Sequence, residues 1–244
     1  MENNLKDGEV LEDLQLDGLK ILQNKNLYRF TSDAVTLANF VSAKPSDCLL
    51  DIGTGSGIVA ILCAHKNRLS KVVGVEIQPQ LSDMAQRSVE INGMSSKIKI
   101  INCDVKDFAK KSNQLFDVIT CNPPYKKAGP NQKNQNQSKA IARHEITLSL
   151  KELCEVVRKK LKFGGKVYVC MDAVRSVELL FELKSAHLEP KKMFFTQSGS
   201  KSDAKLVFVQ ATNGGKEGVQ VLPTLITNDL DGSYLETVKK MRFE

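Results

Sequence analysis

Residues 49–60 read LLDIGTGSGIVA, and this stretch decides how the chain folds. An apolar run that contains Asp51 is followed by glycines at alternate positions, and a second apolar run then begins. Glycine lets a backbone turn tightly and approach a ligand closely. We therefore expect a buried strand, a glycine turn formed around Gly53, Gly55 and Gly57, and a helix that starts at this turn.

The same alternation of strand and helix continues along the chain. Apolar runs suited to strands recur at 48–52, 71–77, 97–104, 116–122, 164–171, 191–197 and 204–211. Strands that alternate with helices predict an α/β fold with a doubly wound, mostly parallel sheet of seven strands. We expect the last of these strands to be the antiparallel one.

The chain has a short segment in front of this core. Residues 14–30 suggest a β-ribbon that turns at 24–26, and a helix that ends at Pro45 follows. We expect a single domain, in which residues 1–45 are an appendage to the core at 46–244.

Composition excludes several classes of protein. The chain has 244 residues, of which 41% are hydrophobic and 26% charged, as is ordinary for a globular protein. No apolar run approaches the ~20 residues that span a bilayer, and the N-terminus lacks a secretory signal pattern, so we expect a cytoplasmic protein.

The six cysteines form no C-x-x-C pair. They are interpreted as buried, reduced thiols, and no metal site is expected.

The distribution of charge suggests a polyanionic partner. The net charge is +7, and the window 122–144 contains no acidic residue. The basic residues of this window are candidates for RNA contact, namely Lys126, Lys127, Lys133, Lys139 and Arg143. Residues 126–139 are rich in Asn, Gln and Lys, so they form either a functional loop or a disordered segment, or a loop that orders on binding.

An acidic residue follows the glycine turn at the spacing used by nucleotide sites. Glu76 ends the next strand, where such a residue can hydrogen-bond the hydroxyls of a ribose. Read from Gly55, GSGIVA also fits the pattern of NAD enzymes. The fuller pattern that starts at Asp51 favours S-adenosylmethionine (SAM), and a purely structural turn is the remaining alternative. Asp104 ends the third strand and can contact an adenine or cap a helix.

Residues 121–125 read CNPPY and follow a buried strand. The side-chain oxygen of Asn122 and the carbonyl of Pro123 can accept the two N–H groups of a planar amine. Pro123 and Pro124 hold the backbone rigid, and Tyr125 offers a face on which a base can stack. The motif therefore suggests transfer of a group to an exocyclic amine without a metal ion, although a proline turn that only ends the strand is the alternative.

These motifs together resemble those of a known family. Class I SAM-dependent methyltransferases, and in particular the bacterial tRNA1(Val) (adenine37-N6)-methyltransferase family, are similar to this chain at 30–41, 51–60, 74–93, 102–108, 116–127, 142–145 and 221–241.

The resemblance implies a Rossmann-like fold, SAM as cofactor and adenine 37 of a tRNA as target. It implies that Asn122 to Tyr125 hold the adenine. It also assigns a set of residues to the cofactor site: Phe30, Thr31, Asp33, Asp51, Gly53, Gly55, Gly57, Glu76, Ile77, Asp104, Val105 and Asn122.

Several other functions are compatible with parts of the pattern. CNPPY would also serve methylation of a protein glutamine, a DNA adenine or an rRNA guanine. A non-catalytic RNA-binding protein that keeps SAM as a structural ligand, and an NAD oxidoreductase, are alternatives from other classes. We expect a tRNA partner and no membrane partner, and among oligomeric states we favour a monomer.

Overall fold

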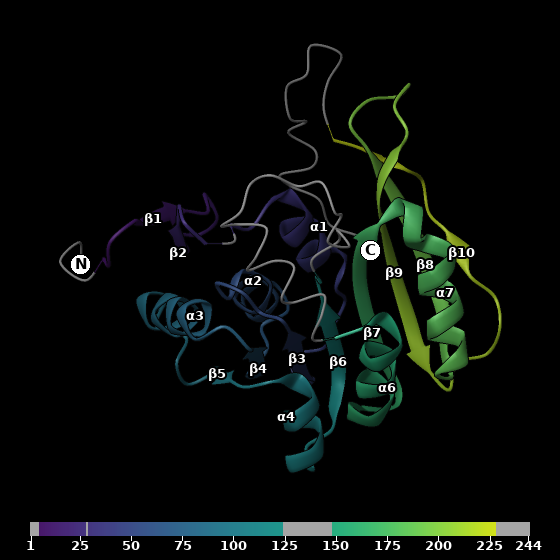
Figure 1. Cartoon of the computed structure of the whole chain (residues 1–244), viewed down its shortest axis with the longest axis horizontal. Coiled ribbons are helices and arrows are strands. Elements are labelled where there is room, and N and C mark those ends of the chain that lie inside the picture. The colour runs from purple at the N-terminus through teal and green to yellow at the C-terminus, as the bar shows by residue number, and fades with distance from the viewer. Residues whose placement is uncertain (1–4, 28, 124–147, 228–244) are drawn as a thin grey trace.

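The computed structural model describes residues 5–27, 29–123 and 148–227. Its centre is one mixed sheet with the strand order β10-β8-β9-β7-β6-β3-β4-β5, and β11 pairs with β8 beside this path (Figure 1). The strands are β3 (Cys48–Ile52), β4 (Lys71–Glu76), β5 (Ile98–Asn102), β6 (Phe116–Cys121), β7 (Leu161–Asp172), β8 (Leu188–Gln197), β9 (Ala204–Asn213), β10 (Gln220–Val221) and β11 (Leu225–Ile226).

The sheet confirms the predicted fold class, although the short strands β10 and β11 add to the seven strands that were expected. Strands β3, β4, β5, β6 and β7 are joined by parallel pairings, whereas β9 runs antiparallel to both β7 and β8. Neighbouring residues of β3 such as Leu49 and Leu50 are both fully buried. A strand that is covered on both faces needs a continuous apolar run, which explains why 48–52 could be recognised from sequence.

Helices pack on both faces of this sheet. One buried cluster joins the strands to α1 (Ser32–Phe40), α2 (Ile58–Lys66) and the end of α3 (Pro79–Ile91). A second cluster joins them to α4 (Val105–Lys111), α6 (Leu150–Lys160) and α7 (Ser176–Ser185), and η2 (Ala173–Arg175) leads into α7. Within the described ranges, no helix is long and apolar enough to cross a membrane.

The N-terminal segment is a two-stranded antiparallel hairpin of β1 (Glu9–Asp13) and β2 (Lys20–Asn24). The expected ribbon over 14–30 with its turn at 24–26 is therefore wrong in detail. The chain turns between the two strands, where Asp17 and Gly18 both have positive φ, 48° and 75°. Asp and Gly both tolerate positive φ well, so the chain turns at Asp17-Gly18 and not at Asn24 to Asn26.

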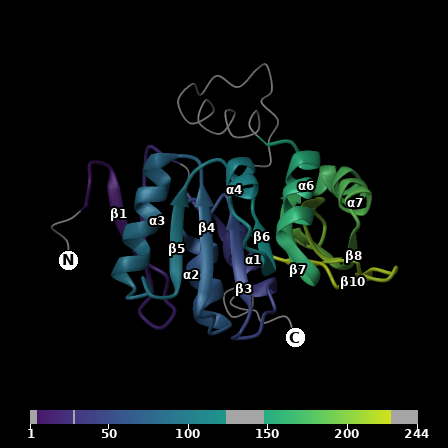
Figure 2. The same ribbon diagram turned by 90° about the horizontal axis from the view of Figure 1, so that it is seen from below.

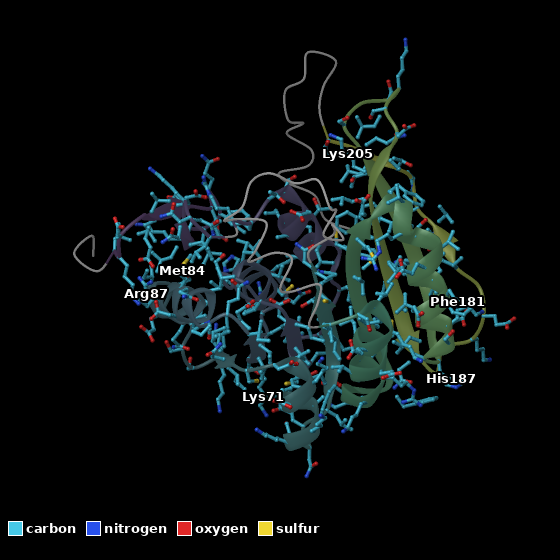
Figure 3. The ribbon with its side chains drawn as sticks, viewed as in Figure 1. Lys71, Met84, Arg87, Phe181, His187 and Lys205 are labelled. Atoms are coloured by element: carbon cyan, nitrogen blue, oxygen red, sulfur yellow. The ribbon has the colours of Figure 1, made fainter. Side chains whose placement is uncertain are left out.

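The hairpin packs on α3 and does not stand alone (Figure 2). Leu22 forms a small apolar cluster with Leu81 and Met84, and its backbone N–H donates to Ser88 Oγ at 3.0 Å. Arg87 pairs with Glu9 of β1, and Figure 3 shows Arg87 and Met84 on the part of α3 that lies beside the hairpin. These contacts anchor the first strands to the core.

The helix expected over 143–161 begins later than predicted. Leu148 and Ser149 are not helical, and α6 starts at Leu150. Ser149 and Glu152 form a reciprocal capping box, which satisfies N–H groups that the first turn of a helix leaves unpaired. Residues 143–147, the 126–139 loop and the final helix expected after 231 lie outside the described residues.

Candidate active site

The strand register brings the predicted motifs to one edge of the sheet. Ile52 of β3 is paired with Cys121 of β6 on one side and with Val75 of β4 on the other. The glycine turn, Glu76 and Asn122 therefore leave the sheet from adjacent strands at their carboxyl ends. Ligands of doubly wound sheets bind at this edge, at the point where the strand order reverses.

The glycine turn is open toward the outside of the protein. Gly53, Gly55 and Gly57 have φ of 69°, 57° and 90°, a conformation that favours glycine. A Cβ added at Gly53 or Gly55 would meet no heavy atom within 4 Å, whereas at Gly57 it would lie 3.3 Å from Cβ of Ala85. Gly57 thus permits close packing of α2 on α3. The other two glycines expose bare backbone, which fits the close approach of a nucleoside-containing cofactor.

Glu76 is buried, with 2% of its surface exposed, and organises the turn. Its Oε2 accepts from the backbone N–H of Gly55 at 3.0 Å, and its Oε1 accepts from that of Gln78 at 2.9 Å. A carboxylate has about four acceptor positions, so these bonds are compatible with a further contact to ribose hydroxyls. The predicted acidic residue therefore lies against the predicted glycine.

Asp51 lies beneath the turn and is fully enclosed. Its carboxylate accepts from the hydroxyls of Thr54 at 2.6 Å and Thr120 at 2.7 Å, which ties the glycine turn to β6. Burial raises the pKa of Asp51 to about 6, an effect that the two hydroxyls oppose. Asp51 is therefore placed to support the turn from below. Its predicted contact with the cofactor stays a prediction.

Asn122 lies beside the first turn of α1. Its Nδ2 donates to Oδ2 of Asp33 at 3.3 Å, and Asp33 is itself 4% exposed. Asn122 and Pro123 are both half-buried, and Cys121 before them is buried in the core. Burial raises the pKa of the Cys121 thiol well above its usual range, so this thiol remains a neutral core group.

The hairpin contributes a residue that no sequence motif marks as functional. Gln23 is fully buried, and its Nε2 donates to Oγ of Ser56 in the glycine turn at 2.9 Å. Its Oε1 accepts from the backbone N–H of Phe30 at 3.2 Å. Gln23 therefore connects β2, the glycine turn and the segment that leads into α1. A single Gln in a strand carries no sequence signal for such a contact.

The remaining predicted cofactor residues lie around the same edge. Phe30 is half-buried and Thr31, the residue before α1, is exposed with its hydroxyl bonded to Asp33. Ile77 follows β4 and is half-buried. Asp104 caps α4, since it accepts from the backbone N–H of Lys106 at 2.7 Å, and Val105 is buried.

Several predicted residues fall outside the described part of the chain. They are Pro124, Tyr125, Lys126, Lys127, Lys133, Lys139 and Arg143. Their expected roles in holding the target base and the RNA stay predictions.

Known proteins resemble this chain in sequence and in fold. The family model for the methyltransferase small domain matches residues 31–178. A tRNA1(Val) (adenine(37)-N6)-methyltransferase of Shewanella sediminis is 27% identical over 227 residues, which cover 86% of this chain and 88% of that protein.

Two solved structures show the same fold. A predicted O-methyltransferase from Agrobacterium tumefaciens superposes with a TM-score of 0.67 at 16% identity, over 85% of this chain and 95% of that one. Geranyl diphosphate C-methyltransferase from Streptomyces coelicolor, in complex with S-adenosyl-L-homocysteine, gives a TM-score of 0.53 at 12% identity, over 74% of this chain and 78% of that one.

The sheet, the open glycine turn with Glu76 and these matches define a class of protein, the SAM-dependent methyltransferases. The chain belongs to the methyltransferase small domain family. This membership confirms the predicted fold, the predicted cofactor and the resemblance noted from the motifs, and it sets the NAD alternative aside.

Proposed function

We propose that this enzyme methylates the N6 amine of an adenine in tRNA, with adenine 37 of tRNA1(Val) as the target. The observation that carries the proposal is the position of Asn122. The residue follows β6 directly beside the glycine turn, and its amide nitrogen is engaged by Asp33. Because the NH2 group faces Asp33, the amide oxygen faces away from that carboxylate.

The chemistry of the substrate explains why an amide oxygen belongs there. The lone pair of an adenine amine is delocalised into the ring, so the nitrogen is a weak nucleophile. An acceptor that holds the N–H hydrogens directs the lone pair out of the ring plane toward the methyl donor. When bound, SAM supplies an electrophilic methyl group. The contribution of the protein is positioning and preorganised hydrogen bonding.

Each residue of the motif then has a separate task. Oδ1 of Asn122 accepts one N–H of the amine, and the carbonyl of Pro123 accepts the other. Pro124 restricts the backbone that carries this carbonyl, and Tyr125 stacks on the base. The methyl group would leave the sulfur of SAM as the new N–C bond forms, so S-adenosylhomocysteine would be released, and the methylated amine would lose one proton to water.

The cofactor is held by backbone and carboxylate groups of the same edge. Gly53 and Gly55, whose Cβ positions are open, would leave room for the nucleoside, and Glu76 would contact the ribose. Phe30, Thr31, Ile77, Asp104 and Val105 complete the pocket. These assignments rest on the resemblance and on the open backbone of the turn.

The proposed RNA partner is supported by charge and by the relatives. The net charge is +7, and the acid-free window 122–144 adjoins the proposed catalytic motif. The related protein of Shewanella sediminis is named for a tRNA substrate. Lysines at 126, 127, 133 and 139 would contact phosphates, so binding should weaken as salt rises. Because the proposed substrate is a tRNA, we expect the enzyme to act in the cytoplasm.

The test is a transfer assay with labelled SAM. Purified enzyme is incubated separately with total tRNA, total rRNA, DNA and a protein extract, and the label is followed into each fraction. We expect label in tRNA, released as N6-methyladenosine on digestion to nucleosides. Label in protein glutamine or in rRNA guanine would show that the substrate is not tRNA. Absence of transfer to every fraction would contradict the proposal that the protein is a methyltransferase acting on these substrates.

A further inference from the structure

Asp33 and Asn122 come from distant parts of the chain and meet at the proposed active site. Asp33 lies in the first turn of α1, and Asn122 follows β6, 89 residues later. Oδ2 of Asp33 lies 3.3 Å from Nδ2 of Asn122, and the hydroxyl of Thr31 donates to Oδ1 of Asp33. Asp33 is 4% exposed, so its carboxylate lies inside the protein.

The chemistry of the two groups determines which way the amide of Asn122 faces. An ionised carboxylate can only accept hydrogen bonds, whereas an amide has a donating and an accepting end. The NH2 group of Asn122 must therefore be the end that faces Asp33. Its Oδ1 is then turned away from the carboxylate, in the orientation that an amine substrate requires.

We propose that Asp33 is a positioning residue that sets the amide orientation of Asn122 and strengthens its oxygen as an acceptor. This role deepens the proposed function and rests on it. It differs from the cofactor contact that the resemblance suggested for Asp33. Without the carboxylate, the amide of Asn122 could rotate and present its NH2 group to the substrate, where a donor would repel the N–H groups of an amine.

The charge of Asp33 adds to its effect on orientation. A hydrogen bond to an ionised acceptor is stronger than one between neutral groups. Hydrogen bonds in series polarise one another, so donation from Nδ2 to a carboxylate makes Oδ1 of Asn122 a better acceptor. The acceptor strength matters in the transition state, where the amine N–H groups become more acidic.

Substitutions of Asp33 separate positioning from cofactor binding. With Asp33→Asn, the carbonyl end of the new amide can still accept from Asn122, so we expect kcat to fall about tenfold. With Asp33→Leu, the carboxylate that accepts from Asn122 is lost, and we expect kcat to fall at least about 100-fold. In both variants the Kd of SAM should stay within about twofold of wild type.

A matched substitution controls for a general effect of removing a helix-terminal charge. Asp107 is an exposed aspartate in the first turn of α4. Asp107→Leu should leave kcat near the wild-type value. If Asp33→Leu instead weakens SAM binding and its kcat recovers at saturating SAM, Asp33 is a cofactor contact and the inference is overturned.

An exchange of the two side chains gives the sharpest test. Asn122→Asp alone places two carboxylates in contact, a pair in which one must become protonated, and we expect kcat to fall about 100-fold. In the double variant Asp33→Asn with Asn122→Asp, the amide at position 33 donates and the carboxylate at position 122 accepts, so the hydrogen bond is restored with its direction reversed. We expect it to recover at least about tenfold over Asn122→Asp.

The outcomes distinguish this inference from the proposed function. Failure of the exchange to recover activity, in a double variant that still binds SAM, would overturn the role of Asp33 while leaving the tRNA proposal intact. Transfer to a guanine or glutamine amine, with the exchange still effective, would overturn the proposed substrate and support Asp33, since Asn122 would serve any planar amine in the same way.

Discussion

The carboxylate of Glu76 accepts a hydrogen bond from the backbone N–H of Gly55 at 3.0 Å, and so joins the end of β4 to the glycine turn after β3. The same side chain accepts from the backbone N–H of Gln78 at the start of α3. A residue expected to contact ribose therefore also holds the shape of the turn.

Replacement of Glu76 should weaken SAM binding. Glu76→Ala removes the ribose acceptor and leaves buried N–H groups unpaired, so we expect a loss of about 2–3 kcal/mol, or at least about 30-fold in Kd. Calorimetric titration with SAM measures the change. Glu90→Ala, at an exposed position of α3, is the matched control. An unchanged Kd for Glu76→Ala would remove Glu76 from the cofactor site.

Loss of the amide at position 122 should stop chemistry but spare cofactor binding. We expect Asn122→Ala to lower kcat by at least about 100-fold, because an acceptor for the developing charge on the amine is lost. The Kd of SAM should change by less than about twofold. Turnover of this variant near the wild-type rate would show that Asn122 does not accept from the substrate.

Asp51 should make stability depend on pH. Its pKa is raised from 3.8 to about 6 in the folded protein, chiefly by burial. The folded state then holds a proton that the unfolded state has released, so the free energy of unfolding falls as pH rises between these two values. From pH 5 to pH 7 the contribution of Asp51 is a loss of about 1.3 kcal/mol.

Asp51→Asn isolates this contribution, because an amide does not titrate. Urea unfolding of wild type and variant at both pH values provides the measurement. The wild type should lose about 1.3 kcal/mol more than the variant over this interval. Equal pH slopes for the two proteins would mean that the carboxylate is not held in a raised-pKa environment.

Gln23 should couple the hairpin to the cofactor site. Gln23→Leu keeps the size of the side chain but leaves the backbone N–H of Phe30 and the hydroxyl of Ser56 without this partner. We expect a loss of about 2–4 kcal/mol in unfolding free energy and weaker SAM binding. Gln86→Leu on α3 is the control. Unaltered stability and SAM affinity would show that the hairpin is independent of the site.

Local patterns in the sequence predicted the parts of the structure that depend on local chemistry. The strand at 48–52 is a continuous apolar run because both of its faces are buried, and Gly53 and Gly55 are glycines because φ is positive there. Glu76 was recognisable because parallel strands end at a common edge. The hairpin was misplaced because Asn24 to Asn26 and Asp17-Gly18 are competing turn signals.

Contacts between distant segments could not be predicted in this way. Asp33 and Asn122 are 89 residues apart, and Gln23 and Ser56 are 33 apart. Neither pair has a periodicity or a spacing that marks it. Such contacts depend on how α1 and the hairpin pack against the sheet, which is decided by tertiary structure. The sequence therefore indicated the chemical groups but not the pairs that orient them.

Transfer of a methyl group to N6 of adenine 37 can be measured directly. The enzyme and labelled SAM are incubated with two transcripts of tRNA1(Val), one unaltered and one with guanine in place of adenine 37. We predict N6-methyladenosine at position 37 of the first transcript and no label in the second. Equal labelling of both transcripts, or labelling of neither by an enzyme that binds SAM, would contradict it.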